Sequence, residues 1–217
     1  MPSATLPAAG RRVVAPYVTA WSEETDPPCR LVEVPGGGIG YVDETVSDRD
    51  AHGVLSFRTP WRHGVGRPVF GKVHPLRQRR AMRRLLCQVC AEPADRTEVG
   101  VLWLLRDYRE DWPGWPNGMG VTEPPVCLPC ARLSVQVCPA LRKGAVLVRA
   151  GRYEVAWVHG GLYTGWREPC QVSRVTVSFT NPAVRWVRAV SLVRELWTCT
   201  LVALDELASG QLATSPK

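Results

Sequence analysis

The sequence predicts an α+β fold of short antiparallel strands, a central four-cysteine module and a long C-terminal amphipathic helix. Three observations favour this class: short apolar runs between Gly and Pro residues, two closely spaced cysteine pairs, and an apolar pattern of helical period near the C-terminus. Of the 217 residues, 45% are hydrophobic and 22% are charged, which is typical of a globular rather than a disordered chain. We expect three segments, 1–75, 76–142 and 143–217, within one compact unit.

The first segment is expected to be rich in strands. Its Pro- and Ala-rich start, within residues 1–28, is expected to be poorly ordered. Three short strands follow, the first two joined by a Pro-Gly-Gly-Gly turn: Cys29–Val34, Gly40–Val46 and Gly53–Arg58. Residues 59–75 are basic and rich in Gly and Pro, which indicates an exposed loop.

The second segment is expected to contain two helices with a buried strand between them. Pro75 can open a helix over Leu76–Leu86, because proline suits the first helical position. The apolar run within Thr97–Leu105 predicts a buried strand, and residues 107–125, rich in Trp and Pro, predict a long rigid loop after it. A second helix is expected over Leu128–Ala140, directly after the second cysteine pair.

The third segment is expected to begin with strands and to end in a long helix. The expected strands are Val146–Arg149, Tyr153–His159 and Gln171–Phe179. Asn181 and Pro182 then supply an N-cap and a proline at the first helical position. From Pro182 to Ala208 apolar residues recur at helical spacing, which predicts an amphipathic helix over 182–208. This helix would either cover the face of a sheet or provide a surface for self-association.

Four of the eight cysteines form two tight pairs that are typical of a metal site: Cys87 with Cys90, and Cys127 with Cys130. Each pair has the C-x2-C spacing, and together the pairs supply four thiolates, a ligand set of structural zinc. An iron–sulfur cluster, a redox pair and plain buried cysteines stay open as alternatives. Cys138 is expected to lie about 12 Å from Cys130 along the helix, at about 1.5 Å per residue, which is too far to share one ion.

The order C-x2-C, strand, loop, C-x2-C and helix resembles a treble-clef zinc module over residues 85–141. The resemblance implies that Cys87 and Cys90 form a zinc knuckle and that the second pair opens the helix. HNH nucleases are built on such a module with a catalytic histidine near its first strand, but no histidine lies between Cys90 and Cys127. The resemblance therefore implies the scaffold without the nuclease activity. The phrases at 124–131 and 138–142 also resemble uncharacterised actinobacterial proteins, to which we attach no activity.

The formal net charge of +7 arises from one part of the chain. Residues 58–84 contain nine Lys and Arg residues and no acid, whereas residues 1–50 contain eight acidic and four basic residues. Such concentrated charge favours an anionic partner, and nucleic acid (DNA or RNA) is the first candidate. The predicted nucleic-acid-binding residues are Trp61, Arg62, Arg67, Lys72, Arg77, Arg79, Arg80, Arg83 and Arg84. A solvated or internally paired face and an acidic protein partner are the alternatives.

These observations predict a zinc-stabilised nucleic-acid-binding protein. A protein–protein interaction adaptor built on the zinc module is the first alternative, and an enzyme with a pocket near Trp112 and Trp115 is the second. Catalysis has little support, because no paired histidines and no H-E-x-x-H motif are present. The chain has no run of about 18 apolar residues and no apolar N-terminal signal, so we expect a cytoplasmic protein rather than a membrane protein.

Overall fold

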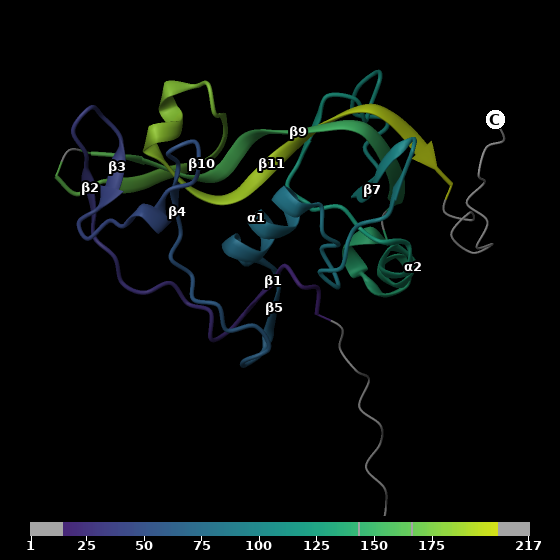
Figure 1. The fold of residues 1–217 in the computed structure, drawn as a ribbon, viewed down its shortest axis with the longest axis horizontal. Helices are drawn as coiled ribbons and strands as arrows, with labels where there is room; N and C mark the ends of the chain where they lie inside the picture. The colour runs from purple at the N-terminus through teal and green to yellow at the C-terminus, as the bar shows by residue number, and fades with distance from the viewer. Residues whose placement is uncertain (1–14, 143, 166, 204–217) are drawn as a thin grey trace, which may run out of the picture.

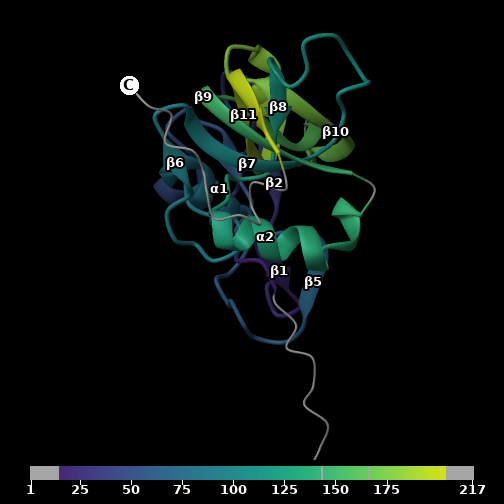
Figure 2. The same ribbon diagram turned by 90° about the vertical axis from the view of Figure 1, so that its right-hand side faces the viewer.

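The computed structural model describes residues 15–142, 144–165 and 167–203, and these form a seven-stranded sheet, two two-stranded sheets and two α-helices (Figure 1). Both helices lie on the same side of the large sheet, as two views at right angles show (Figures 1 and 2). Among the described residues, no helix is long and apolar enough to cross a membrane.

Two long strands, β9 and β11, form the centre of the large sheet. β9 spans Ala145–Thr164 and β11 spans Val187–Val202. They pair antiparallel along almost their whole length, with Val187 opposite Leu162 at one end and Val202 opposite Leu147 at the other. Both strands are rich in β-branched and aromatic residues, which favour the extended conformation.

Shorter strands extend the sheet on both sides of this pair. β7 (Gly100–Arg106) and β10 (Cys170–Ser178) pair with different halves of β9, and β6 (Arg96–Thr97) pairs with β7. On the other side, β4 (Leu55–Ser56) and β8 (Met119–Val121) pair with different parts of β11. The pairing of β4 with β11 is parallel, and the others are antiparallel. The sheet therefore takes strands from all three segments of the chain.

Two smaller sheets lie beside the large one. β2 (Leu31–Glu33) and β3 (Ile39–Tyr41) form an antiparallel hairpin around the predicted turn. β1 (Thr19–Trp21) pairs antiparallel with β5 (Pro68–Val73), and we call this pair the β1–β5 ribbon. In Figure 1 the ribbon projects below the large sheet, next to α1.

Helix α1 (Pro75–Arg84) is fixed to the centre of the large sheet. Its first residue is the predicted proline, which suits the first turn because its missing N–H is not needed there. Gln78 is fully buried, and its side-chain amide donates to the carbonyls of Thr122 and Leu192 at 2.8 Å. The Gln78 Oε1 accepts from the Leu192 N–H at 3.0 Å. These bonds set the orientation of α1 and of the arginines on it.

Strand β7 is buried on both faces. Trp103 packs in one hydrophobic cluster, whereas Leu102 and Leu104 pack on the opposite face in a cluster with residues of α2. α2 (Leu128–Val137) covers this second face. The double burial explains why the sequence of β7 is a continuous apolar run, since a strand covered on both sides has no polar face.

The predicted helix over 182–208 is wrong, and so is the α+β class. Pro182–Trp186 form a single 3-10 segment capped by the Asn181 side chain, and β11 follows directly. The described residues are mainly strands, and the two α-helices have ten residues each. The helical period misleads because β11 is buried at consecutive positions, so its apolar residues do not alternate. Residues 204–208 of the predicted helix lie outside the described residues.

Without this helix, the described part of 182–208 offers no helical surface for self-association, and self-association itself stays a prediction. Between Val187 and Val202 the chain lies inside the large sheet, with β9 on one side and β4 and β8 on the other. Of the apolar positions that predicted the seam, Val187 and Val193 are buried in the monomer, whereas Leu201 is 45% exposed. Pairing with the long strand β9 therefore outweighs the helix signals of the Asn181 cap and Pro182.

Three smaller differences have the same origin. The two strands expected over 146–159 are parts of the single strand β9. The expected loops 59–75 and 107–125 contain β5 and β8, and β1 lies within residues 1–28. Each of these short strands forms on a partner distant in sequence, so the local pattern does not reveal it.

Candidate metal centre and basic surface

The structure brings the four predicted metal ligands together. The sulfur atoms of Cys87, Cys90, Cys127 and Cys130 all lie within 4.8 Å of one another. The Sγ atoms of Cys90 and Cys127 are 3.7 Å apart. Four sulfurs around one zinc ion, at a Zn–S distance of about 2.3 Å, are separated by about 3.8 Å in a tetrahedron. The cluster therefore has the size and the donor atoms to hold one metal ion.

The first cysteine pair lies in a tight turn between α1 and β6. The helix ends at Leu85, whose left-handed φ of 52° turns the chain away from the helix axis. Ala91 has a positive φ of 66°, and its N–H donates to the Cys87 carbonyl at 2.9 Å. The Val89 N–H donates to the Cys87 sulfur at 3.4 Å. Hydrogen bonds from backbone N–H groups to sulfur favour the thiolate, the form that binds a metal.

The second cysteine pair lies at the start of α2. Cys127 is the N-cap residue, and Cys130 lies in the first turn after Pro129. The N-terminus of a helix carries a partial positive charge, which favours thiolates. Burial raises the pKa of the Cys127 thiol to about 11 and also raises the pKa of Cys130. The protonated thiols are thus favoured until a metal ion takes the place of the protons.

Cys87 anchors the centre in the core. Its side chain is fully buried in the cluster that contains Leu102 and Leu147. Burial opposes ionisation, but hydrogen bonds from backbone N–H groups outweigh it and lower the pKa of Cys87. The Gln88 N–H donates to the Pro125 carbonyl at 2.9 Å, which ties the first cysteine turn to the chain that leads into the second. The core therefore positions both halves of the centre.

The other cysteines lie apart from this cluster. Cys138 is the C-cap residue of α2, at the opposite end of the helix from Cys127. Cys29, Cys170 and Cys199 belong to other parts of the fold. The ligand set is thus the four cysteines that their spacing predicts, and four sulfurs suit either zinc or an iron–sulfur cluster.

The basic segment 58–84 divides into paired and exposed side chains. Four of its arginines form ion pairs with acids of the first fifty residues: Arg58 with Asp43 and Asp48, Arg77 with Glu24, and both Arg79 and Arg83 with Asp50. The acidic start of the chain and the basic segment therefore neutralise each other in part, which the sequence shows only as a contrast between two regions.

Two predicted nucleic-acid-binding residues are buried. The Arg77 side chain is 0% exposed and donates to both oxygens of Glu24, at 2.5 and 2.6 Å. Arg79 is 6% exposed and donates to Ser56 and Asp50. Neither side chain lies on the surface, so an exposed nucleic-acid interface would not include them. On the same helix, Arg80 and Arg84 are exposed, so α1 presents only part of its arginines to solvent.

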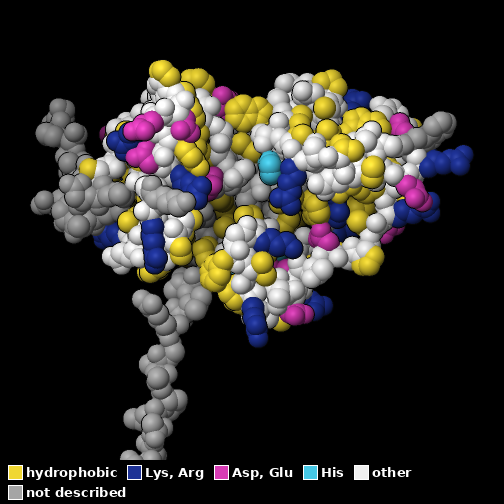
Figure 3. Space-filling view, turned by 180° about the vertical axis from the view of Figure 1, so that it is seen from behind, with side chains coloured by type: hydrophobic (Ala, Val, Ile, Leu, Met, Phe, Trp, Pro, Cys, Tyr) yellow, Lys and Arg dark blue, Asp and Glu magenta, His cyan; other side chains and the backbone are white. Residues whose placement is uncertain are grey.

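The remaining predicted residues are exposed and form what we call the basic surface. It comprises Trp61, Arg62, Arg67, Lys72, Arg80, Arg83 and Arg84, together with Phe70. Trp61 is 51% exposed and Phe70 is 59% exposed, so both large aromatic side chains present apolar surface to solvent. In the space-filling view from behind, the projection that holds the β1–β5 ribbon carries Lys and Arg side chains together with hydrophobic and acidic ones (Figure 3).

Tyr17 connects the ribbon side of this surface to α1. Its ring centroid lies 6.2 Å from that of Trp61, and its hydroxyl accepts from Arg80 at 3.1 Å. Sequence reasoning missed both Tyr17 and Phe70. Phe70 could have been predicted, because it lies between two basic residues of the segment. Nothing in the sequence, in contrast, places Tyr17 beside α1.

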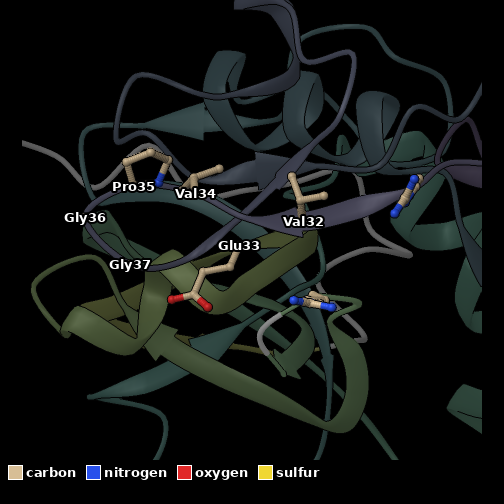
Figure 4. Close-up of a pocket in the computed structure, with 8 residues that line it drawn as sticks. Val32, Glu33, Val34, Pro35, Gly36 and Gly37 are labelled. Carbon is tan, nitrogen blue, oxygen red and sulfur yellow. The ribbon is translucent and has the colours of Figure 1, made fainter.

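The two tryptophans of the enzyme alternative differ in exposure. Trp115 is buried in the core, and Trp112 is 37% exposed. A cavity of about 660 Å³ lies elsewhere, along the β2–β3 hairpin, and Figure 4 shows Glu33 among the residues that line it. It is lined by Val32–Gly37 together with Arg30 and Arg167, and this lining includes no histidine or cysteine. We assign no chemistry to this cavity.

No protein-family description, no curated protein and no solved structure matches the chain.

Proposed function

We propose that the protein is stabilised by zinc and binds single-stranded nucleic acid, DNA or RNA, through its basic surface. One observation carries the proposal: on and beside the β1–β5 ribbon, exposed aromatic rings lie among exposed basic side chains. Trp61 and Phe70 offer faces for bases to stack on, and Arg62, Arg67 and Lys72 offer charge to phosphates. No acid occurs in residues 58–84, and the exposed acid beside the ribbon is Glu23, which follows β1.

Zinc is the metal that we propose for the four cysteines, with a structural role. All four ligands come from the protein, which is typical of structural rather than catalytic zinc. The order of cysteine turn, β6–β7 hairpin and α2 supports the resemblance to a treble-clef module. The centre begins directly after α1, so it would help to hold Arg80, Arg83 and Arg84 in place. A surface held rigid before binding loses less conformational entropy when it binds.

The salt dependence of binding tests the nucleic-acid proposal. For oligothymidylate, the logarithm of the binding constant is expected to fall linearly with that of the salt concentration, by about 0.7 per phosphate contacted. The triple variant Arg62→Gln, Arg67→Gln and Lys72→Gln should flatten the slope by up to about 2, because three phosphate contacts are removed. Fluorescence anisotropy over a KCl series measures both slopes.

A second triple variant controls for net charge. Arg96, Arg142 and Arg174 are exposed on other elements, and their replacement by Gln removes the same charge. This control should leave the slope nearly unchanged. Equal flattening by the two triple variants would show that binding depends on overall charge, and it would contradict an interface on the ribbon.

Phe70→Ala tests the stacking part of the proposal. Loss of one stacked base costs about 1–3 kcal/mol, which corresponds to weaker binding by about 5- to 150-fold. The side chain is exposed, so the variant should keep its fold. Val172→Ala, on β10 and 55% exposed, is the matched control. Unchanged affinity of Phe70→Ala for oligothymidylate would exclude Phe70 from the interface.

A further inference from the structure

A second feature of α1 is a pocket on its outer side. The pocket has a volume of about 380 Å³ and lies between α1 and the segment 47–57. Five arginines line it, with a single acid, Asp50. The arginines are Arg49, Arg79, Arg80, Arg83 and Arg84. Its volume is within the range of about 300–1,000 Å³ that is usual for pockets that bind small ligands.

The acid in the pocket does not balance its positive charge. Asp50 Oδ2 lies 3.2 Å from Arg79 and 3.7 Å from Arg83, so one carboxylate serves two guanidinium groups. The other oxygen, Oδ1, accepts from the N–H groups of His52 and Val54 at 2.9 and 3.0 Å. Asp50 therefore has no capacity left for a further cation.

The other arginines add to this excess. Arg49 is paired with Glu44 at 2.6 Å, outside the pocket lining. Among the described residues, no acid lies within ion-pair distance of Arg80 or Arg84. With Arg49 neutralised by its partner, four arginines face one carboxylate. The pocket thus has a net positive charge.

Arg79 adds a largely buried guanidinium group to the positive charge of the pocket lining. It is 6% exposed, yet its Nε has no hydrogen-bond partner among the described residues. Burial lowers the pKa of Arg79, and so does the neighbouring charge of Arg83. A buried guanidinium that is only partly compensated is costly unless a further negative charge approaches it.

We propose that this pocket binds a phosphate monoester group. Several guanidinium groups on one site suit the three oxygens of a phosphate, which arginine forks contact in pairs. Ser47 and Ser56 add hydroxyl groups to the lining. Arg80 lines the pocket and is also part of the basic surface, where it bonds to the neighbouring Tyr17, so the terminal phosphate of a bound strand is the source that the geometry favours. That choice of source rests on the proposed function, whereas the pocket itself does not.

Two substitutions on exposed positions test the pocket without disturbing Arg79. Ser47→Glu places a carboxylate among the arginines, and Arg84→Gln removes one charge-assisted hydrogen bond. Each should weaken phosphate binding by about tenfold or more. Arg174→Gln on β10 is the control and should have no effect. Thermal melting of each variant shows whether the fold is kept.

The ligands are chosen to separate the two possible sources. Full-length protein is titrated with oligothymidylate that carries a 5′-phosphate, a 3′-phosphate or neither, and with thymidine monophosphate and inorganic phosphate. We expect a phosphorylated strand to bind about tenfold tighter than the unphosphorylated strand, and this preference should disappear in Ser47→Glu. The ribbon triple variant should weaken all strands alike and keep the preference.

The outcomes distinguish the pocket from the proposed function. Binding of thymidine monophosphate or inorganic phosphate that Ser47→Glu abolishes, without binding of any strand, supports the pocket and overturns the nucleic-acid proposal. Strand binding that is indifferent to the terminal phosphate and to Ser47→Glu, with no binding of the small phosphates, overturns the pocket and leaves the ribbon interface standing.

Discussion

Purified protein is expected to contain about one zinc ion per chain, and Cys87→Ser is expected to release the ion and unfold the middle of the chain. Cys87 is the ligand that is fully buried, and it lies in the same hydrophobic cluster as β7 and α2. In this variant the sulfurs of Cys90, Cys127 and Cys130 would lack the metal ion that holds the two cysteine pairs together. Loss of a structural metal is among the few changes that cost more than about 4 kcal/mol.

Plasma mass spectrometry and urea unfolding measure these two effects. Cys170→Ser is the matched control, because Cys170 is exposed on β10 and lies outside the cluster. It should bind the same amount of zinc and keep the wild-type free energy of unfolding within about 0.5 kcal/mol. Iron and sulfide in place of zinc would assign an iron–sulfur cluster. A stable, folded Cys87→Ser variant, or a folded protein without metal, would contradict a structural centre.

Glu24→Gln is expected to destabilise the protein by about 3–5 kcal/mol, the cost of leaving a buried charge without its partner. The Glu24 side chain is 0% exposed and is the acid that pairs with the equally buried Arg77. It also accepts from the N–H groups of Trp21 at 2.9 Å and Arg62 at 3.0 Å. The substitution keeps the shape of the side chain but replaces an acceptor oxygen by an amide that faces donors. The ribbon, the basic loop and α1 meet at this carboxylate.

Glu23→Gln provides a control of the same chemistry one residue away. Glu23 is exposed, so the free energy of unfolding of the Glu23→Gln variant in urea should stay within about 0.5 kcal/mol of the wild-type value. If Glu24→Gln were as stable as this control, the buried ion pair would not be what fixes the ribbon to α1.

The same carboxylate predicts a pH dependence. Burial alone would raise the pKa of Glu24, but hydrogen bonds from Arg77 and Trp21 outweigh it and hold the pKa below its usual range. The ionised form is therefore favoured in the folded state, and its contribution is present above the unfolded pKa of about 4.3. It is lost as the pH falls through the folded value. The difference in stability between wild type and Glu24→Gln should shrink below about pH 4, and a constant difference would contradict this origin.

The metal centre was predictable because its signal is local and chemical. Two residues separate the cysteines of each pair, so both sulfurs of a pair can reach one ion whatever the rest of the chain does. The structure confirms that the two pairs come together, through the core around Leu102 and Leu147. The start of α1 was predictable for a similar reason, since Pro75 restricts the backbone at its own position.

The C-terminal strand was not predictable in the same way. Asn181 does cap a turn and Pro182 does open it, as expected, but only five residues follow the local signals. From Val187 the chain pairs with β9, and burial on both faces removes the alternation that identifies most strands. The same spacing of apolar residues can therefore occur in an amphipathic helix and in a central strand. In this chain, pairing with β9 decides in favour of the strand.

By itself, the sequence determined which four cysteines form the candidate metal site and where α1 begins. It also determined that the positive charge is concentrated in one segment. Only the tertiary structure decided which of those charges are free. Arg77 meets an acid 53 residues away, and Arg79 meets one 29 residues away, whereas Arg80 and Arg84 on the same helix stay exposed. The physical reason is that ion pairs and strand pairs form between groups that are close in space. Folding brings these groups together from distant parts of the sequence, and a local sequence pattern does not show which ones will meet.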